Sequence, residues 1–182
     1  GATGGRATVA GIDVLSQPKR LGSVVGYLPD YLVPYEGMRV WEYLDFFGGA
    51  YGIGRAGGRR VVDDVLALTD LGGVREKLAG ALSKGMRQRL CLAKTLIHDP
   101  KVLILDEPAN GLDPRARIEF RELLRELQSM GKTILISSHI LTELSDVCNA
   151  VAVLEKGGLV ASGDVASIRA RLAASPRVRI EV

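Results

Sequence analysis

The chain has 182 residues, 47% of them hydrophobic, so it can bury a substantial core and suits one domain. Its 24 basic and 21 acidic residues are interspersed, and a net charge of +3 gives little reason to expect a nucleic-acid partner. Cys91 and Cys148 are far apart in the sequence, which favours buried thiols in a reducing cytoplasm over a disulfide or a zinc site. No apolar run approaches the roughly 18 residues that span a bilayer, so we expect any membrane role to come through a partner.

The predicted strands are short, apolar or β-branched runs, of the kind found in parallel sheets that are covered on both faces. They are Val24–Leu28, Val102–Leu105, Thr133–Ser137 and Ala150–Leu154. Helical patterns separate them, which predicts an α/β fold with a mostly parallel sheet. In such folds ligands bind beyond the carboxyl ends of the strands.

A helical insertion of about residues 40–96 is predicted between the first two of these strands. Val40, Tyr43, Leu44 and Phe47 stand at offsets 0, 3, 4 and 7, which indicates an apolar helix face. Eight of the nine aromatic residues also lie between positions 27 and 51. Local core packing explains several of these aromatic residues, and a docking surface is the alternative for others.

A further helix is predicted over residues 115–130, with Gly131 as its C-terminal cap. The run Gly131-Lys132-Thr133 resembles the end of a phosphate-binding loop. However, a phosphate-binding loop follows a strand and precedes a helix, whereas here a helix comes first and a strand follows. We therefore interpret this run as a helix end.

The last quarter of the chain predicts a helix over residues 140–148 and two short strands across the turn at 156–158. Another helix begins near Asp164. Pro176 then breaks the pattern, and residues 178–182 alternate like a strand. The expected organisation is a main domain over residues 1–175 and the start of a C-terminal extension at 176–182.

Four short motifs follow one another in a fixed order. They are Leu82-Ser83-Lys84-Gly85-Met86-Arg87-Gln88-Arg89, Val102-Leu103-Ile104-Leu105-Asp106-Glu107-Pro108, Gly111-Leu112-Asp113-Pro114 and Ser137-Ser138-His139. The ordered set resembles the ATP-binding subunit of ABC transporters, over nearly the whole chain. The wording of residues 27–52 and 82–114 is most similar to the ATPases of bacterial ABC-2 type exporters.

The resemblance gives roles to the polar residues at the strand ends. Asp106 ends an apolar strand, where a carboxylate needs a compensating cation, and it is the expected Mg²⁺ ligand. Glu107 is expected to orient or deprotonate the attacking water, and His139 to contact the γ-phosphate of ATP. A solvated turn is the alternative for the two carboxylates, and a histidine at a helix start is the alternative for His139.

The resemblance also predicts contacts between two subunits. The run Ser83-Lys84-Gly85-Met86 stands where the family usually has Ser-Gly-Gly-Gln, and Ser83, Gly85 and Met86 are expected to touch the nucleotide bound by the other subunit. Ser83 can also cap a helix, and an ordinary helix start is the alternative for this segment. Asp113, followed by Pro114, predicts a helix N-cap and a contact at the subunit boundary.

Two further expectations concern metal binding and docking. Asp30 stands where the family usually has a glutamine that touches Mg²⁺ and water, and an aspartate on a surface loop is the alternative. At least one of Tyr31, Tyr35 and Trp41 is expected to dock a transmembrane permease.

The sequence thus predicts an ATPase subunit that binds ATP and Mg²⁺, dimerises with a second ATPase subunit and drives a permease from the inner face of the cell membrane. The alternatives are a soluble ABC ATPase outside transport and a non-catalytic interaction subunit. The family's loop Gly-x-x-x-x-Gly-Lys-Ser/Thr is absent from these residues. We therefore expect a domain that is truncated before its short strand and turn at residues 7–13, and that is inactive alone.

Overall fold

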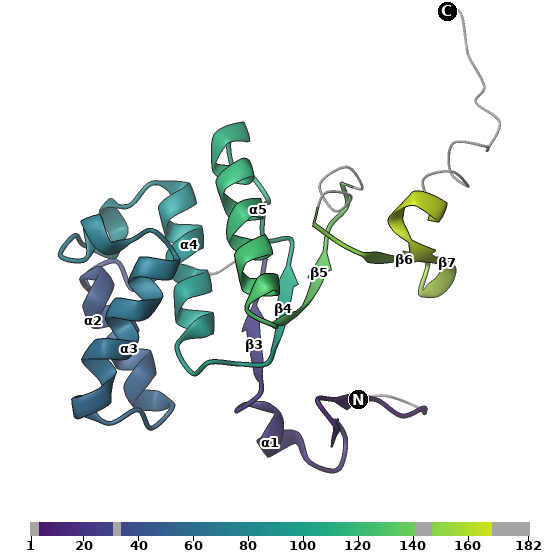
Figure 1. Ribbon diagram of the computed structural model, residues 1–182, viewed down its shortest axis with the longest axis horizontal. Coiled ribbons are helices and arrows are strands. Elements are labelled where there is room, and N and C mark those ends of the chain that lie inside the picture. Colours follow the sequence, from purple (N-terminus) through teal and green to yellow (C-terminus); the bar gives the residue numbers. More distant parts are fainter. Residues whose placement is uncertain (1–3, 31–33, 141–146, 169–182) are drawn as a thin grey trace, which may run out of the picture. The chain divides into compact units, whose positions relative to one another are not determined.

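The computed structural model describes residues 4–30, 34–140 and 147–168 (Figure 1). The chain forms two compact units, Gly1–Ser137 and Ser138–Val182. Three of the sequence-based predictions lie wholly or largely outside the described residues. They are the docking role of Tyr31, the helix over residues 140–148 and the extension at 176–182.

A three-stranded parallel sheet organises the first unit. Its strands, in spatial order, are β3 (Val25–Leu28), β4 (Val102–Asp106) and β5 (Thr133–Ser137). Both pairings are parallel, which confirms the predicted α/β class. Because the strands are parallel, the polar residues that end β4 and β5 lie at the same edge of the sheet.

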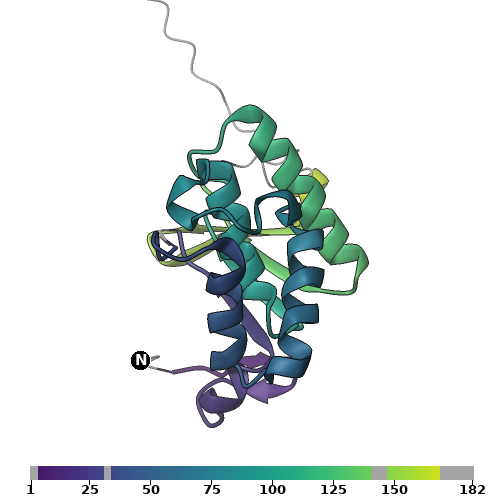
Figure 2. The same ribbon diagram turned by 90° about the vertical axis from the view of Figure 1, so that its left-hand side faces the viewer.

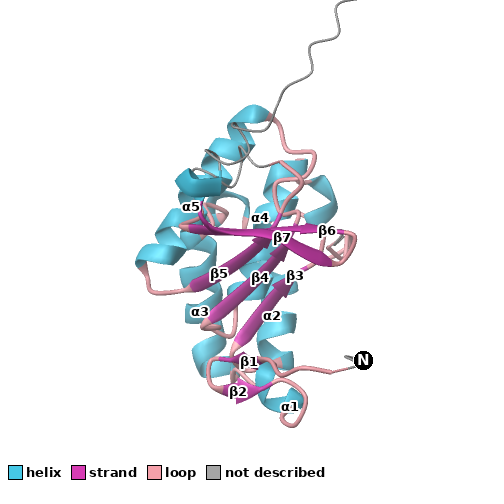
Figure 3. Ribbon diagram, turned by 90° about the vertical axis from the view of Figure 1, so that its right-hand side faces the viewer, coloured by secondary structure: helices cyan, strands magenta, loops and turns pink. Residues whose placement is uncertain are grey.

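The helices between residues 40 and 129 lie on one face of this sheet (Figure 3). Leu28, Leu103 and Leu105 are buried on that face. Helix α4 (Lys84–Leu96) approaches so closely that a Cβ on Gly26 would lie 2.7 Å from the Thr95 methyl group. Only glycine fits there without displacing the helix.

The opposite face of the sheet carries a row of apolar side chains. The strand register aligns Tyr27, Ile104 and Leu135 across the three strands. Tyr27 is 52% exposed and Leu135 is 62% exposed. The sequence pattern predicted cover on both faces, and among the described residues of the first unit only one face has it.

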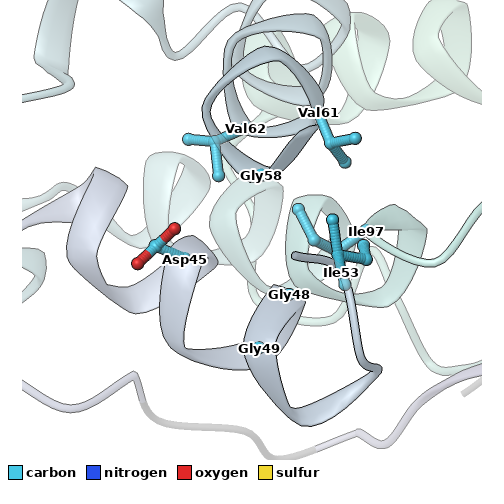
Figure 4. Close-up of a pocket in the computed structure, with 8 residues that line it drawn as sticks. All are labelled: Asp45, Gly48, Gly49, Ile53, Gly58, Val61, Val62 and Ile97. Atoms are coloured by element: carbon cyan, nitrogen blue, oxygen red, sulfur yellow. The ribbon is translucent and has the colours of Figure 1, made fainter. Parts of the chain in front are cut away.

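Three α-helices and two short 3₁₀ helices separate β3 from β4, where the sequence predicts a helical insertion. Helix α2 (Val40–Ala50) buries Val40, Tyr43 and Leu44, and α3 (Arg55–Leu68) packs beside it (Figure 2). Figure 4 shows the seam between them, where Gly48 and Gly58 allow close approach beside Ile53, Val62 and Ile97. Two short 3₁₀ helices, η1 (Gly72–Val74) and η2 (Ala79–Ala81), then lead to α4.

Helix α5 (Pro114–Ser129) connects β4 to β5. Its end has the hydrogen bonds of a Schellman motif, in which Gly131 N–H donates to the Gln128 carbonyl and Lys132 N–H to that of Leu127. Gly131 has φ +84°, which favours glycine. The run Gly131-Lys132-Thr133 is therefore a helix end, as predicted.

Short antiparallel pairs occur at both ends of the described chain. Strands β1 (Thr8–Val9) and β2 (Ile12–Asp13) form the predicted strand and turn, and α1 (Pro18–Leu21) follows. In the second unit β6 (Ala150–Glu155) pairs antiparallel with β7 (Gly158–Asp164).

The assignment of residues 150–154 to the parallel sheet was wrong. The predicted turn is present, and Lys156 and Gly157 both have positive φ, as a two-residue hairpin turn requires. Such a tight turn returns the chain antiparallel to the strand it leaves, so β7 becomes the partner of β6.

No described helix is both long and apolar enough to cross a membrane.

The two cysteines differ in exposure. Cys91, in α4, is buried, and this burial raises the pKa of its thiol to about 11. Cys148 is half-buried. The expectation of buried thiols therefore holds fully for Cys91 and partly for Cys148.

His98 has a structural role just beyond α4. Its Nε2 lies 3.1 Å from the Val25 carbonyl oxygen, and its ring stacks on Tyr51 with centroids 3.9 Å apart. Its Nδ1 is buried without a hydrogen-bond partner among the described residues. Burial is the largest influence on the His98 pKa and lowers it below the usual 6.5.

The lowered pKa of His98 predicts a loss of stability in mild acid. Below pH 6.5 the unfolded chain binds a proton that the folded chain takes up only at lower pH. The contribution of His98 is therefore complete above pH 6.5 and is lost as pH falls through the folded-state pKa. We expect the melting temperature of His98→Gln to fall less between pH 7.5 and pH 5.5 than that of the wild type. Equal falls would contradict this role.

Candidate functional site

Asp106 and Ser137 face each other where β4 and β5 end. They are register partners in the parallel pair, and the Ser137 hydroxyl donates a hydrogen bond to Asp106 Oδ1. Asp106 is half-buried at the end of an apolar strand, where an unpaired carboxylate would be costly. The hydroxyl satisfies one of its two oxygens.

Glu107 leaves the strand in a strained conformation. Its φ is +46°, in the left-handed region that residues other than glycine seldom adopt. Such backbone costs on the order of 1–3 kcal/mol and persists only when neighbouring contacts hold it. Those contacts come from Ser137, whose carbonyl oxygen and Oγ lie 3.2 and 3.1 Å from the Glu107 nitrogen. The turn directs Glu107 away from the line of the strand.

The loop after Glu107 reaches the end of β3. Asn110 N–H donates to the Glu107 carbonyl at 3.0 Å, which closes a turn. The Asn110 side-chain amide donates to Asp30 Oδ1 at 3.2 Å. Asp30 is exposed, as a surface-loop aspartate would be, yet it is tied to the loop that carries Glu107. The expected contact of Asp30 with Mg²⁺ stays a prediction.

The helices that begin in the first and third motifs are both capped as predicted. Ser83 Oγ accepts from Met86 N–H at 3.3 Å, and Asp113 Oδ1 accepts from Ala116 N–H at 2.9 Å, with Pro114 at the first helical position. These bonds leave other amides of each first turn directed outward, as an anion site requires.

These two helix starts are in contact. A Cβ on Gly85 would lie 3.2 Å from the Ala116 Cβ, so Gly85 allows α4 to lie against α5. Lys84 replaces a glycine of the family pattern, and its ammonium lies 1.9 Å from the place where a Cβ on Gly111 would be. Ser83, Gly85, exposed Met86 and Asp113 consequently belong to one surface.

His139 lies in the second unit. It is exposed, in a bend that follows β5, and the neighbouring Ser138 Oγ accepts from Ile140 N–H at 3.0 Å. Its approach to Asp106 and Glu107 stays a prediction, because the two units are described separately.

The aromatic residues considered for docking differ in their surroundings. Tyr35 is 57% exposed and packs with Tyr43, Phe46 and Phe47, and Phe46 is 52% exposed. Trp41 is half-buried, and its Nε1 donates to Glu76 at 3.2 Å. The described surface thus favours Tyr35 over Trp41 as an anchor.

Sequence reasoning missed two residues of the site and one contact. Ser137 and Asn110 carry the hydrogen bonds that join the strand ends, and Lys84 packs on the loop before α5. A signal for Ser137 was present, because it is a polar residue at the end of an otherwise apolar strand. Neither Asn110 nor the Lys84 contact has a comparable local signal.

Comparison with known proteins gives matches over most of the chain. Residues 2–110 match the family model of the ABC transporter. An uncharacterised ABC transporter ATP-binding protein of Synechocystis is 39% identical over 172 residues, covering 92% of this chain and 47% of that protein. The Nod factor export ATP-binding protein I of Burkholderia lata is 36% identical, covering 87% of this chain and 52% of that protein.

A solved structure agrees with these relatives. It is cbiO1 from Clostridium perfringens, part of the ABC transporter complex cbiONQ, with a TM-score of 0.82 and 29% identity over 93% of this chain and 70% of that one. The chain spans about half the length of the curated relatives described above. The family model, the relatives and the fold agree, and the chain belongs to the ABC transporter family.

Proposed function

We propose that this protein binds and hydrolyses ATP with Mg²⁺ and so drives a membrane permease, in the manner of an exporter ATPase. The observation that carries the proposal is the cluster at the ends of β3, β4 and β5, where Asp30, Asp106 and Glu107 are linked through Asn110 and Ser137. Family membership supports ATP as the ligand.

The available oxygen atoms fit a magnesium ion that is held mainly by phosphates. Among the described residues no three or more His, Cys, Asp or Glu side chains gather as a complete metal cage. Mg²⁺ rarely uses such a cage, because it keeps several waters and is bound through one or two carboxylates and the substrate phosphates. The proposed protein ligands of the magnesium ion are Asp106 and Asp30. Ser137 occupies one carboxylate oxygen of Asp106, which leaves the other for the ion.

Held by these residues, Mg²⁺ would supply positive charge that stabilises the negative charge developing during transfer of the γ-phosphoryl group. Glu107 is the proposed residue that orients the attacking water and accepts its proton. Because the backbone of Glu107 turns out of the strand at φ +46°, its carboxylate is proposed to serve a different partner from that of Asp106. His139 is the proposed contact to the γ-phosphate.

The surface made by Ser83, Gly85, Met86 and Asp113 is proposed to act on the nucleotide of a second ATPase subunit. Two capped helices begin there, and helix N-termini favour anions. The ammonium of Lys84 adds positive charge beside Gly111. Two ATP molecules would thus be enclosed between subunits, and hydrolysis would reopen the pair.

The proposed permease contact is the aromatic cluster around α2. Tyr35 and Phe46 are exposed large aromatic side chains, and such residues are enriched as anchors at protein interfaces. The proposed location is the inner face of the cell membrane, where the subunit is held through the permease.

Replacing Glu107 tests the catalytic assignment. In the full-length protein Glu107→Gln should lower kcat at least about a hundredfold and leave ATP binding intact, because the water-handling group acts mainly in the transition state. It should also accumulate an ATP-bound dimer on size-exclusion chromatography. Glu122→Gln, at an exposed position of α5, is the matched control and should behave as wild type. Turnover of Glu107→Gln within about twofold of wild type would remove Glu107 from this role.

Replacing Asp30 tests the proposed metal shell. Asp30→Asn should raise the Mg²⁺ concentration for half-maximal turnover by roughly tenfold, since metal ligands and their supports change affinity on this scale. Asp30→Gln should be tolerated better, because it restores the donor and reach usual in the family. Asp64→Asn, at an exposed position of α3, controls for charge. Identical Mg²⁺ titrations for all four proteins would show that Asp30 is a surface-loop residue.

A further inference from the structure

Ser137 has contacts with both neighbouring carboxylate residues at the site. Its hydroxyl donates to Asp106 Oδ1 and accepts from Glu107 N–H at 3.1 Å. Its carbonyl oxygen lies 3.2 Å from the same nitrogen. A serine hydroxyl has one proton to donate and lone pairs that accept hydrogen bonds, so the Ser137 hydroxyl is a donor and an acceptor at the same time.

The strand register puts Ser137 in this place. Asp106 and Ser137 are the last partners of the β4–β5 pair, so Ser137 lies opposite the point where the Glu107 backbone turns. The order of the bonds is Glu107 N–H to Ser137 O–H to Asp106 carboxylate. In such a chain each bond polarises the next, and the charged acceptor strengthens the whole.

We propose that Ser137 is a positioning residue, which holds Asp106 in place for the metal ion and fixes Glu107 in the turn that aims it at water. This inference rests on the proposed function. By occupying Oδ1, the hydroxyl fixes the rotation of the carboxylate and leaves its other oxygen for the ion or its water. By bonding the Glu107 amide, Ser137 stabilises a backbone that would otherwise relax from φ +46°.

Three substitutions separate this role from simple packing. Ser137→Ala removes the hydroxyl and keeps the carbonyl bond to Glu107 N–H. Ser137→Thr keeps the hydroxyl and is favourable in a strand. Ser129→Ala is the matched control, because Ser129 Oγ also donates a hydrogen bond at an exposed place, to the Glu126 carbonyl at the end of α5.

Two measurements on the full-length protein are required. The first is amide hydrogen exchange of Glu107 without nucleotide, which should become at least about threefold faster in Ser137→Ala and return to the wild-type rate in Ser137→Thr. The second is the Mg²⁺ concentration for half-maximal ATP turnover, which should rise roughly tenfold in Ser137→Ala and recover in Ser137→Thr. Ser129→Ala should change neither.

The outcomes separate this inference from the proposed function. Unchanged exchange in Ser137→Ala would overturn the positioning role, and so would faster exchange with an unchanged Mg²⁺ requirement. Failure of Ser137→Thr to restore either quantity would assign the effect to packing and overturn it as well. A wild-type protein without ATP turnover would defeat the proposed function, while exchange with rescue by threonine would still support the role of Ser137 in holding Glu107.

Discussion

The pairing of β4 with β5 is the constraint on which the site depends. Because the strands run parallel and in fixed register, Asp106 and Ser137 end them side by side. A shift of one residue would reverse the faces of β5 and remove the hydroxyl from the carboxylate. Leu103 and Leu105 of β4 are buried beneath the helices, and moving β4 by one residue against β5 would expose them. Core packing thereby determines the place of the polar groups at the edge.

A short loop transmits this placement to the rest of the site. It leaves β4 at Glu107, joins Asp30 through Asn110, passes Lys84 at Gly111 and ends at the Asp113 cap of α5. Gly111 has φ +65° and lies against a lysine ammonium, so the loop needs a residue without a side chain there. One loop, residues 107–113, thus links the carboxylates to the starts of α4 and α5. This arrangement favours a surface on which the carboxylates and the helix starts can both act on phosphate groups.

Local patterns predicted the elements better than the contacts. The helix predicted at residues 115–130 is Pro114–Ser129, and Ser83 and Asp113 cap their helices, since capping depends on neighbours in sequence. Residues 150–154 were placed in the wrong sheet because apolar runs do not specify their partners. The roles of Ser137 and Asn110 depend on bonds to residues at least 30 positions away, so a local pattern can mark Ser137 as the polar end of a strand but cannot indicate the partners of either residue. The predicted approach of His139 stays a prediction.

The most direct measurement of the central claim locates the metal ion itself. With Fe²⁺ in place of Mg²⁺ and ATP bound to the full-length protein, peroxide and ascorbate generate radicals that cut the backbone nearest the ion. The account predicts cuts beside Asp106 and Asp30, dependent on ATP and lost in Asp106→Ala. Cuts confined to other segments, or unchanged in Asp106→Ala, would contradict a metal site at the ends of these strands.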